Sequence, residues 1–308
     1  MNILITGVAG FIGSHTADEF LKDNNYNVVG VDNLTYAGKL TNIKKAKRNN
    51  QFKFIKEDIC NFDKIKTICE KENIDCILNF AAETHVDNSI QDPKPFLQTN
   101  ISGVLSILEV CKKLDIKLLH ISTDEVYGTR NEGSFDENSN FDPRNPYSAT
   151  KAAAEHLIKS YENTYGISFI IVRPSNNFGP RQHEEKFLPT IIKSIKENKP
   201  IPIYGNGKQI REWLYVKDNA RVIKYILENG KLGEVYNITS NNEVENLSFV
   251  NMVYNVFGKE YEKKIEFVKD RPGHDKRYSI TNKKLVELGF NKFTDLEFAL
   301  KETISNEY

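Results

Sequence analysis

The N-terminal stretch NILITGVAGFIGSHTADEF (residues 2–20) decides the fold of this chain. It begins with a short apolar segment, Asn2–Thr6, and passes into a helix pattern over Ile12–Lys22, with three glycines at the junction. Glycine permits a tight turn, the approach of backbone to a pyrophosphate and close contact between helix and strand. The spacing GxxGxxG is a weak signal alone, but between a first strand and a first helix it predicts a dinucleotide site. The helix N-terminus would then face the pyrophosphate with free N–H groups.

Short apolar segments alternate with amphipathic ones through the first half of the chain. The apolar segments resemble strands buried on both faces, and they are Asn2–Thr6, Asn27–Asp32, Phe52–Ile55, Cys76–Ala81, Lys117–Ser122 and Ser168–Arg173. The predicted helices between them are Ile12–Lys22, Asp63–Glu72, Pro95–Leu114 and Pro146–Tyr165. This alternation predicts an α/β fold, a doubly wound (Rossmann) parallel sheet with helices on both faces.

The pattern changes after about residue 175. Five prolines between positions 174 and 202 interrupt it, and helices resume only at Val216–Glu228, Leu247–Phe257 and Asp295–Ile304. We therefore predict a dinucleotide-binding domain over residues 1–175 and a smaller C-terminal lobe over residues 176–308. Some segments of the lobe are expected to return to the first domain.

Composition excludes several classes of protein. The 308 residues carry 42 Lys plus Arg and 42 Asp plus Glu, and this net charge of zero argues against a nucleic-acid partner. No segment reaches the ~18 apolar residues of a membrane helix, and the N-terminus lacks a signal-peptide pattern. The four cysteines and six histidines lack the spacing of metal sites. We expect free thiols, no metal and a cytoplasmic location.

Acidic residues close the second and third predicted strands. Asp32 is placed to accept hydrogen bonds from both ribose hydroxyls of a dinucleotide, and it would repel the 2′-phosphate of NADP. NAD is therefore the predicted cofactor. Asp58 and Ile59 would lie beside the adenine.

Tyr147 and Lys151 form a YxxxK pair at the start of a predicted helix. Residues four apart share one helix face, so the ammonium can lie near the phenol oxygen. Its charge would favour the phenolate and lower the pKa of Tyr147. A phenolate beside a nicotinamide can take a hydroxyl proton while hydride leaves the same carbon.

Together these features resemble the extended short-chain dehydrogenase/reductases that act on nucleotide sugars, and within them the dTDP-glucose 4,6-dehydratases. The segments that carry the resemblance span nearly the whole chain, and they are VDNLTYAG (31–38), AAETHVDNSI (81–90), STDEVYG (122–128), PYSATKAAAEHL (146–157), NNFGP…EKFLP (176–189), QIREWLYV (209–216) and DRPGHDKRYSI (270–280). The resemblance implies an NAD-dependent lyase of deoxysugar biosynthesis, such as that of rhamnose, and a homodimer.

Adjacent carboxyls, Asp124 and Glu125, favour a dehydratase over the epimerases of the same superfamily, which generally lack this pair. Different environments can split the pKa values of two neighbouring carboxyls, so that one acts as an acid and the other as a base. The resemblance implies that Tyr147 deprotonates the sugar 4-OH while NAD⁺ takes hydride from C4, with Thr123 bonded to the 4-OH. Glu125 then removes the C5 proton, Asp124 protonates the departing 6-OH, and the hydride returns to C6.

The resemblance also assigns binding residues. The expected cofactor contacts are Gly7, Gly10, Phe11, Ile12, Gly13, Asp32, Asn33, Leu34, Thr35, Asp58, Ile59, Phe80, Ala81, Ala82, Thr99, Tyr147, Lys151 and Asn177. The expected nucleotide-sugar contacts are Thr84, Thr123, Asn176, Lys186, Phe187, Pro202, Ile203, Tyr204, Arg211, Asn242, Asp270, Arg271 and His274. Arginine and lysine suit a diphosphate, since a guanidinium can bind two oxygens at once.

Three alternatives stay open on the sequence. The nucleobase is undecided, because one methyl group separates thymine from uracil and changes binding by only ~1–3 kcal/mol. A 4-epimerase or decarboxylase on the same scaffold is a second reading, and a module that binds nucleotide sugar or NAD without catalysis is a third. The helices over Pro95–Leu114 and Pro146–Tyr165 are candidates for the dimer contact.

Overall fold

A computed structural model describes residues 1–258, 262–270 and 275–307. A seven-stranded sheet with the order β10-β6-β5-β4-β1-β2-β3 forms its centre, and every pairing in it is parallel. The strands are β1 (Asn2–Thr6), β2 (Asn27–Asp32), β3 (Phe52–Lys56), β4 (Cys76–Asn79), β5 (Lys117–Ile121), β6 (Phe169–Pro174) and β10 (Glu234–Ile238). The predicted doubly wound fold is confirmed.

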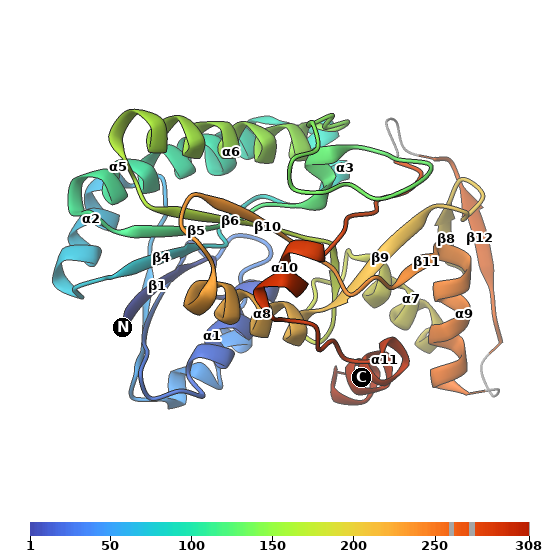
Figure 1. The fold of residues 1–308 in the computed structure, drawn as a ribbon. Helices are drawn as coiled ribbons and strands as arrows, with labels where there is room; N and C mark the ends of the chain where they lie inside the picture. Colours follow the sequence, from blue (N-terminus) through green and yellow to red (C-terminus); the bar gives the residue numbers. More distant parts are fainter. Residues whose placement is uncertain (259–261, 271–274, 308) are drawn as a thin grey trace.

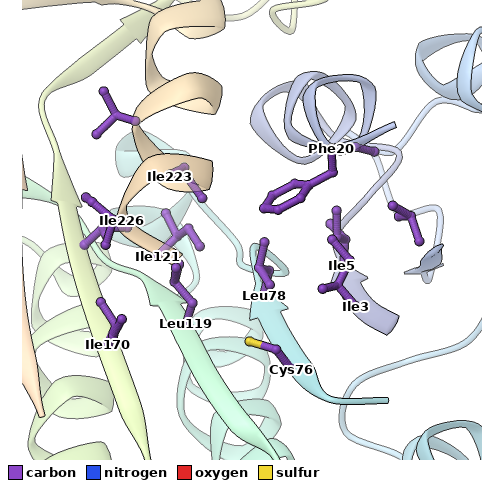
Figure 2. Packing of buried hydrophobic residues seen from close by; sticks show 14 of the residues in the cluster. Ile3, Ile5, Phe20, Cys76, Leu78, Leu119, Ile121, Ile170, Ile223 and Ile226 are labelled. Atoms are coloured by element: carbon purple, nitrogen blue, oxygen red, sulfur yellow. The ribbon is translucent and has the colours of Figure 1, made fainter. Parts of the chain in front are cut away.

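Both faces of this sheet are buried because its strands are apolar at successive positions. Ile3 and Ile5 pack on one face, while Leu4 between them packs on the other. Figure 2 shows the first face, where Phe20 of one helix and Ile223 of another meet the strand side chains. Period-two alternation with no polar face is what a parallel sheet covered by helices on both sides requires.

Two groups of helices cover the sheet (Figure 1). On one face α1 (Phe11–Phe20) packs against α8 (Val216–Asn229), which returns from the C-terminal half together with α10 (Lys283–Leu288). On the other face lie α2 (Phe62–Lys71), α5 (Val104–Leu114) and α6 (Pro146–Tyr165). Short helices connect the strands; they are η1 (Leu40–Ile43), η2 (Ala46–Arg48), α3 (Val86–Gln91), α4 (Lys94–Leu97) and η4 (Asp124–Tyr127).

The helix expected over Pro95–Leu114 is present, but it is not α-helical throughout. A π-helical turn, η3 (Gln98–Gly103), separates α4 from α5. The wider turn places Asn100 inside the protein, where its Nδ2 donates to the Glu83 carbonyl oxygen and to Thr150 Oγ1, at 3.0 Å each. Such turns are frequent at functional sites, and Thr99 in this one lines the cleft described below.

The C-terminal lobe contains two small sheets beside the main one (Figure 1). One has the order β11-β9-β7 and the other pairs β12 with β8. The elements of the lobe are β7 (Asn176–Phe178), α7 (Phe187–Lys196), β8 (Ile201–Tyr204), β9 (Ile210–Tyr215), β11 (Glu243–Glu245), α9 (Asn246–Phe257), β12 (Ile265–Val268) and α11 (Leu296–Glu307). A separate apolar core, which includes stacked Trp213 and Phe249, holds the lobe together.

Candidate active site

A cleft of about 580 Å³ lies between the carboxyl ends of the main sheet and the C-terminal lobe. It begins at the turn after β1 and extends to β8 and β9 of the lobe. In a doubly wound sheet the strand order reverses between β1 and β4, and ligands bind outside the strand ends at that point. The cleft therefore lies where the topology predicts a dinucleotide.

The turn after β1 has room for backbone only. A Cβ on Gly7 would lie 2.8 Å from the Ala81 nitrogen, and one on Gly13 would lie 2.4 Å from the Gly7 carbonyl oxygen. Gly7 also has φ of +64°, which favours glycine. Gly10 precedes α1 with no side chain capping the helix, so the first N–H groups of α1 can bind an anion. These residues fit the pyrophosphate of NAD.

Asp32 ends β2 at the edge of the same cleft. Its Oδ2 accepts from the Ala9 N–H at 2.9 Å and its Oδ1 from the Leu34 N–H at 2.7 Å. Burial raises the pKa of Asp32, while these two hydrogen bonds oppose the rise. The two backbone donors orient the carboxylate, and each oxygen has a second lone pair for a ribose hydroxyl.

The cleft gathers most of the expected cofactor contacts. Those that line it are Gly7, Gly10, Phe11, Ile12, Gly13, Asp32, Asn33, Thr35, Asp58, Ile59, Phe80, Ala81, Ala82, Thr99, Tyr147, Lys151 and Asn177. Leu34 does not line it, because this residue contributes its backbone N–H to Asp32. Asn33 Nδ2 donates to Asp58 Oδ2 at 2.7 Å, which joins the loops after β2 and β3.

Helix α6 directs Tyr147, Lys151 and Glu155 toward the sheet, and all three are buried. The helix begins at a capping box in which Asn145 Oδ1 accepts from the Ser148 N–H at 2.8 Å. Arg173 of β6 binds both oxygens of Glu155 through Nε and Nη2, at 2.9 and 2.6 Å. The capping box and this buried ion pair fix the helix against the sheet.

Lys151 bonds to the sheet rather than to the phenol. Its Nζ donates to the Ile121 carbonyl oxygen at 2.5 Å and lies 3.4 Å from His120 Nε2. Burial lowers the pKa of Lys151 to about 8. Burial and the carboxyls of Glu125 and Asp124 raise the pKa of Tyr147. Burial, rather than the charge of Lys151, therefore sets the direction of the Tyr147 pKa in this arrangement.

Asp124 and Glu125 follow β5 and have opposite surroundings. Asp124 is 2% exposed, its Oδ1 accepts from Thr123 Oγ1 at 3.2 Å, and its Oδ2 has no partner among the described residues. Burial, with the charges of Glu125 and Glu212, raises the pKa of Asp124 well above its usual value. Glu125 is only half-buried, and its Oε2 accepts from Asn145 Nδ2 at 3.2 Å. One carboxyl therefore favours the protonated form, and the other has a donor that stabilises the carboxylate.

The lobe supplies most of the expected nucleotide-sugar contacts, and the loops after β4 and β5 supply Thr84 and Thr123. Those that line the cleft are Thr84, Thr123, Asn176, Lys186, Phe187, Pro202, Ile203, Tyr204 and Arg211. Arg211 is buried, and its Nη1 and Nη2 donate to the carbonyl oxygens of Ile210 and Asp275 at 2.8 and 2.9 Å. Lys186 Nζ donates to the Thr84 carbonyl oxygen at 3.3 Å, which connects the lobe with the loop after β4.

Two expected contacts lie elsewhere, and two more fall outside the described residues. Asn242 does not line the cleft, because its Nδ2 donates to Ser240 Oγ at 3.0 Å within its own loop. Asp270 accepts from Gln209 Nε2 at 3.3 Å and is also absent from the lining. Arg271 and His274 lie outside the described residues.

The sequence reading missed several polar groups of the cleft. Asn246 begins α9, and its buried Oδ1 has no partner in the described part of the chain. Asn145, Asp275 and Tyr278 also line the cleft. Asn145 directly precedes the segment 146–157 that carries the family resemblance. Asp275 and Tyr278 lie within the segment 270–280, in which only Asp270, Arg271 and His274 were assigned to the substrate. Among the described residues no group of His, Cys, Asp or Glu could hold a metal ion, and no helix is long and apolar enough to cross a membrane.

Fold and site together define an enzyme of the extended short-chain dehydrogenase/reductase class that acts on nucleotide sugars. The chain belongs to the family described as GDP-mannose 4,6 dehydratase, whose profile matches residues 4–303. It is 40% identical to the dTDP-glucose 4,6-dehydratase of Salmonella typhimurium, across 99% of this chain and 92% of that protein.

Solved structures of related enzymes have the same fold. The dTDP-glucose 4,6-dehydratase of Bacillus anthracis in complex with NAD has a TM-score of 0.91 and 38% identity, and the match covers 99% of this chain and 96% of that one. A UDP-glucuronic acid 4-epimerase of Bacillus cereus, solved with NAD, has a TM-score of 0.94 and 33% identity over 99% and 98% of the two chains. The fold is therefore common to dehydratases and epimerases, and the side chains of the site must separate them.

Proposed function

We propose that this chain is an NAD-dependent dTDP-glucose 4,6-dehydratase, a hydro-lyase that forms dTDP-4-keto-6-deoxy-glucose. The observation that carries the proposal is the contrast between Asp124 and Glu125. Elimination of water across C5 and C6 needs an acid at the leaving hydroxyl and a base at the C5 proton. The buried Asp124, whose pKa is raised by burial, supports the first role, and the half-buried Glu125 with its amide donor supports the second. A 4-epimerase needs neither group.

Oxidation at C4 is assigned to a second group of residues around the sugar. Tyr147 takes the proton of the 4-hydroxyl, and Thr123 hydrogen-bonds the same oxygen. When bound, NAD would accept hydride in its oxidised form and return it in its reduced form. Lys151 holds its ammonium against the Ile121 carbonyl at 2.5 Å, where it adds positive charge to the floor of the cofactor site. Glu155 and Arg173 keep α6 in register with the sheet.

The two parts of the chain take different tasks in this proposal. Residues 1–175 form the NAD-binding domain, and residues 176–308 form the nucleotide-sugar-binding lobe. Strand β10 and helix α8 of the second part pack with the first. Arg211 and Lys186 suit the diphosphate, and Tyr204 suits the pyrimidine, because arginine and lysine pair with phosphate oxygens and an aromatic ring packs on a base.

We also propose that the enzyme is a homodimer through α4, η3 and α5, together with α6. Leu97, Ile101 and Leu105 lie four residues apart on one helical face, and Leu97 and Leu105 are 49% and 41% exposed. Val104 and Leu108, by contrast, belong to the core. All four cysteines are free, which supports a reducing, cytoplasmic compartment. The product is of the class from which rhamnose and other deoxysugars are made.

Purified protein should be incubated with dTDP-glucose and, separately, with UDP-glucose. A 4-keto-6-deoxy product, identified by mass and by its alkali-induced absorbance, is the expected result with dTDP-glucose. A higher kcat/KM with UDP-glucose would assign the uracil nucleotide instead. A 4-epimer with no loss of water would contradict the dehydratase proposal, and binding without turnover of either sugar would support a sensor.

A further inference from the structure

Glu125 contacts a buried phenol that the proposed reaction has not yet used. Tyr278 lies with its hydroxyl oxygen 3.5 Å from Glu125 Oε2, and it donates to Asp275 Oδ2 at 2.7 Å. Tyr278 and Asp275 are 6% and 1% exposed, and both line the cleft. Glu125, Tyr278 and Asp275 thus form a carboxyl–phenol–carboxyl row, called here the Tyr278 row.

Arg211 fixes the Tyr278 row in place. Its guanidinium carbon lies 4.3 Å from the centre of the Tyr278 ring, and its Nη2 donates to the Asp275 carbonyl oxygen at 2.9 Å. At the outer end, Asp275 Oδ1 lies 3.7 Å from Nε of Arg144, whose side chain is 45% exposed. The row therefore runs from the base at the sugar to a buried carboxyl that lies beside an exposed arginine.

Asn145 and Tyr278, which both contact Glu125 Oε2, differ in what they can transfer. The Asn145 amide nitrogen donates hydrogen bonds but has no lone pair with which to accept a proton. The Tyr278 hydroxyl can accept on its oxygen and donate its own hydrogen at the same time. It has one hydrogen, and the short bond to Asp275 uses it, so the oxygen is left to accept from Glu125 once Glu125 carries a proton.

We propose that Tyr278 and Asp275 form the path by which Glu125 exchanges its proton with solvent during turnover. This inference rests on the proposed 4,6-dehydratase reaction. Glu125 carboxylate takes the C5 proton and becomes a carboxylic acid. Its O–H bond then breaks as a new bond forms to the Tyr278 oxygen, while the Tyr278 O–H proton moves to Asp275. The negative charge thus moves from Asp275 to Glu125. The phenol stays neutral, and no electron is transferred.

Asp275 is suited to receive this proton. Burial raises the pKa of its carboxyl, although the Tyr278 hydroxyl and the charges of Arg211 and Arg144 oppose the rise. It therefore binds a proton more readily than an exposed aspartate does, and the proposed path ends where Asp275 passes that proton to solvent beside the exposed Arg144. A solvent proton that returns along the row reaches Glu125, and from there C5. The hydrogen at C5 of the product then comes from water rather than from the substrate.

The test is the isotope at C5 in deuterated water. Wild type should place solvent deuterium at C5 in nearly every product molecule. Tyr278→Phe keeps the ring beneath Arg211 but removes the relay, and proton escape from Glu125 should slow by about 10²-fold. Its product should then retain mostly the substrate hydrogen at C5, although it still loses water. Asp275→Asn should shift the label in the same direction, and it decides the matter if Tyr278→Phe does not fold.

Tyr225→Phe is the matched control, because its hydroxyl donates to the Leu288 carbonyl at 2.9 Å outside the cleft. This variant should label C5 as wild type does. Full labelling of C5 by both Tyr278→Phe and Asp275→Asn would overturn the proposal, as would wild-type product without solvent deuterium at C5. A wild-type enzyme that forms no 6-deoxy product at all would instead contradict the proposed function.

Discussion

The main sheet and the C-terminal lobe build opposite walls of one cleft by different means. The sheet offers backbone and short side chains at strand ends, such as the glycine turn after β1 and Asp124 after β5. The lobe offers long side chains from small sheets and a helix start, such as Arg211 of β9 and Lys186 before α7. Groups on rigid central elements are suited to chemistry, where small errors of position are costly. Longer side chains at the edge are suited to recognition.

Deleting the phenol on the sheet side should give the largest effect on turnover. Tyr147→Phe keeps the buried ring but loses the proton acceptor, so kcat should fall ~10²–10⁴-fold with little change in KM. Steady-state kinetics measure both. Tyr161→Phe on the same helix removes a hydroxyl that donates to Glu109 at 2.6 Å and should leave kcat unchanged. Equal kinetics for the two variants would remove Tyr147 from the chemistry.

Rigidity of the sheet side can be tested apart from catalysis. Glu155→Gln leaves the Arg173 charge buried without its carboxylate, since both side chains are 1% exposed. The free energy of unfolding should fall by about 3–5 kcal/mol, as measured by urea denaturation. Lys53→Gln removes an ion pair whose lysine is 49% exposed, and it should cost less than about 1 kcal/mol. A similar loss for both would mean that the buried pair does not stabilise α6.

The cofactor end of the sheet side should show a smaller effect. Wild type should purify with NAD bound, since hydride is returned within each turnover. Asp32→Ala removes the ribose acceptor, and affinity should fall by ~10–100-fold, the value of hydrogen bonds to a charged group. Cofactor content after purification and a titration of stripped protein give the measurement, with Asp23→Ala as a surface control. Unchanged occupancy in Asp32→Ala would show that the ribose is bound elsewhere.

The lobe side should respond in binding rather than in chemistry. Arg211→Lys keeps the charge but loses the planar fork that already serves two carbonyl oxygens. KM should rise about fivefold, equivalent to one hydrogen bond of ~1 kcal/mol, while kcat stays near wild type. Arg277→Lys, which keeps the charge but loses the two-point pairing with Glu243 outside the cleft, is the control. A fall in kcat without a rise in KM would place Arg211 in the chemical step.

The sheet could be predicted from sequence because its signals are local. Continuous apolar runs gave β1 and β2 at their observed bounds, and the helix over Pro146–Tyr165 has the observed ends because Asn145 caps it and Gly166 closes it. The C-terminal half could be predicted only in part: α8, α9 and α11 lie within three residues of the predicted helices, but its short strands and α7 were not predicted. Strand β7 has three residues and α7 begins at Phe187 inside a proline-rich segment. Such short elements are stabilised by their neighbours in space, and periodicity does not record those neighbours.

The site shows the same limit. Residue types indicated Asp32, Asp124 and Tyr147, but the direction of a side chain depends on contacts that are distant in sequence. Lys151 points to the Ile121 carbonyl, and Asn242 is bonded within its own loop while Asn246 lines the cleft. Tyr278 is 153 residues from Glu125, which it contacts. No local sequence pattern around either residue predicts this contact.

In the proposed reaction, Asp124 and Glu125 divide the elimination between them after C4 has been oxidised. This division is tested most directly by mixing Glu125→Gln, and separately Asp124→Asn, with dTDP-glucose while the absorbance of reduced nicotinamide and the sugar products are followed together. Both variants should accumulate reduced nicotinamide and form little 6-deoxy sugar, since each missing group slows elimination by ~10²–10⁴-fold. Formation of 6-deoxy sugar by Glu125→Gln at the wild-type rate, with solvent deuterium at C5, would contradict the account.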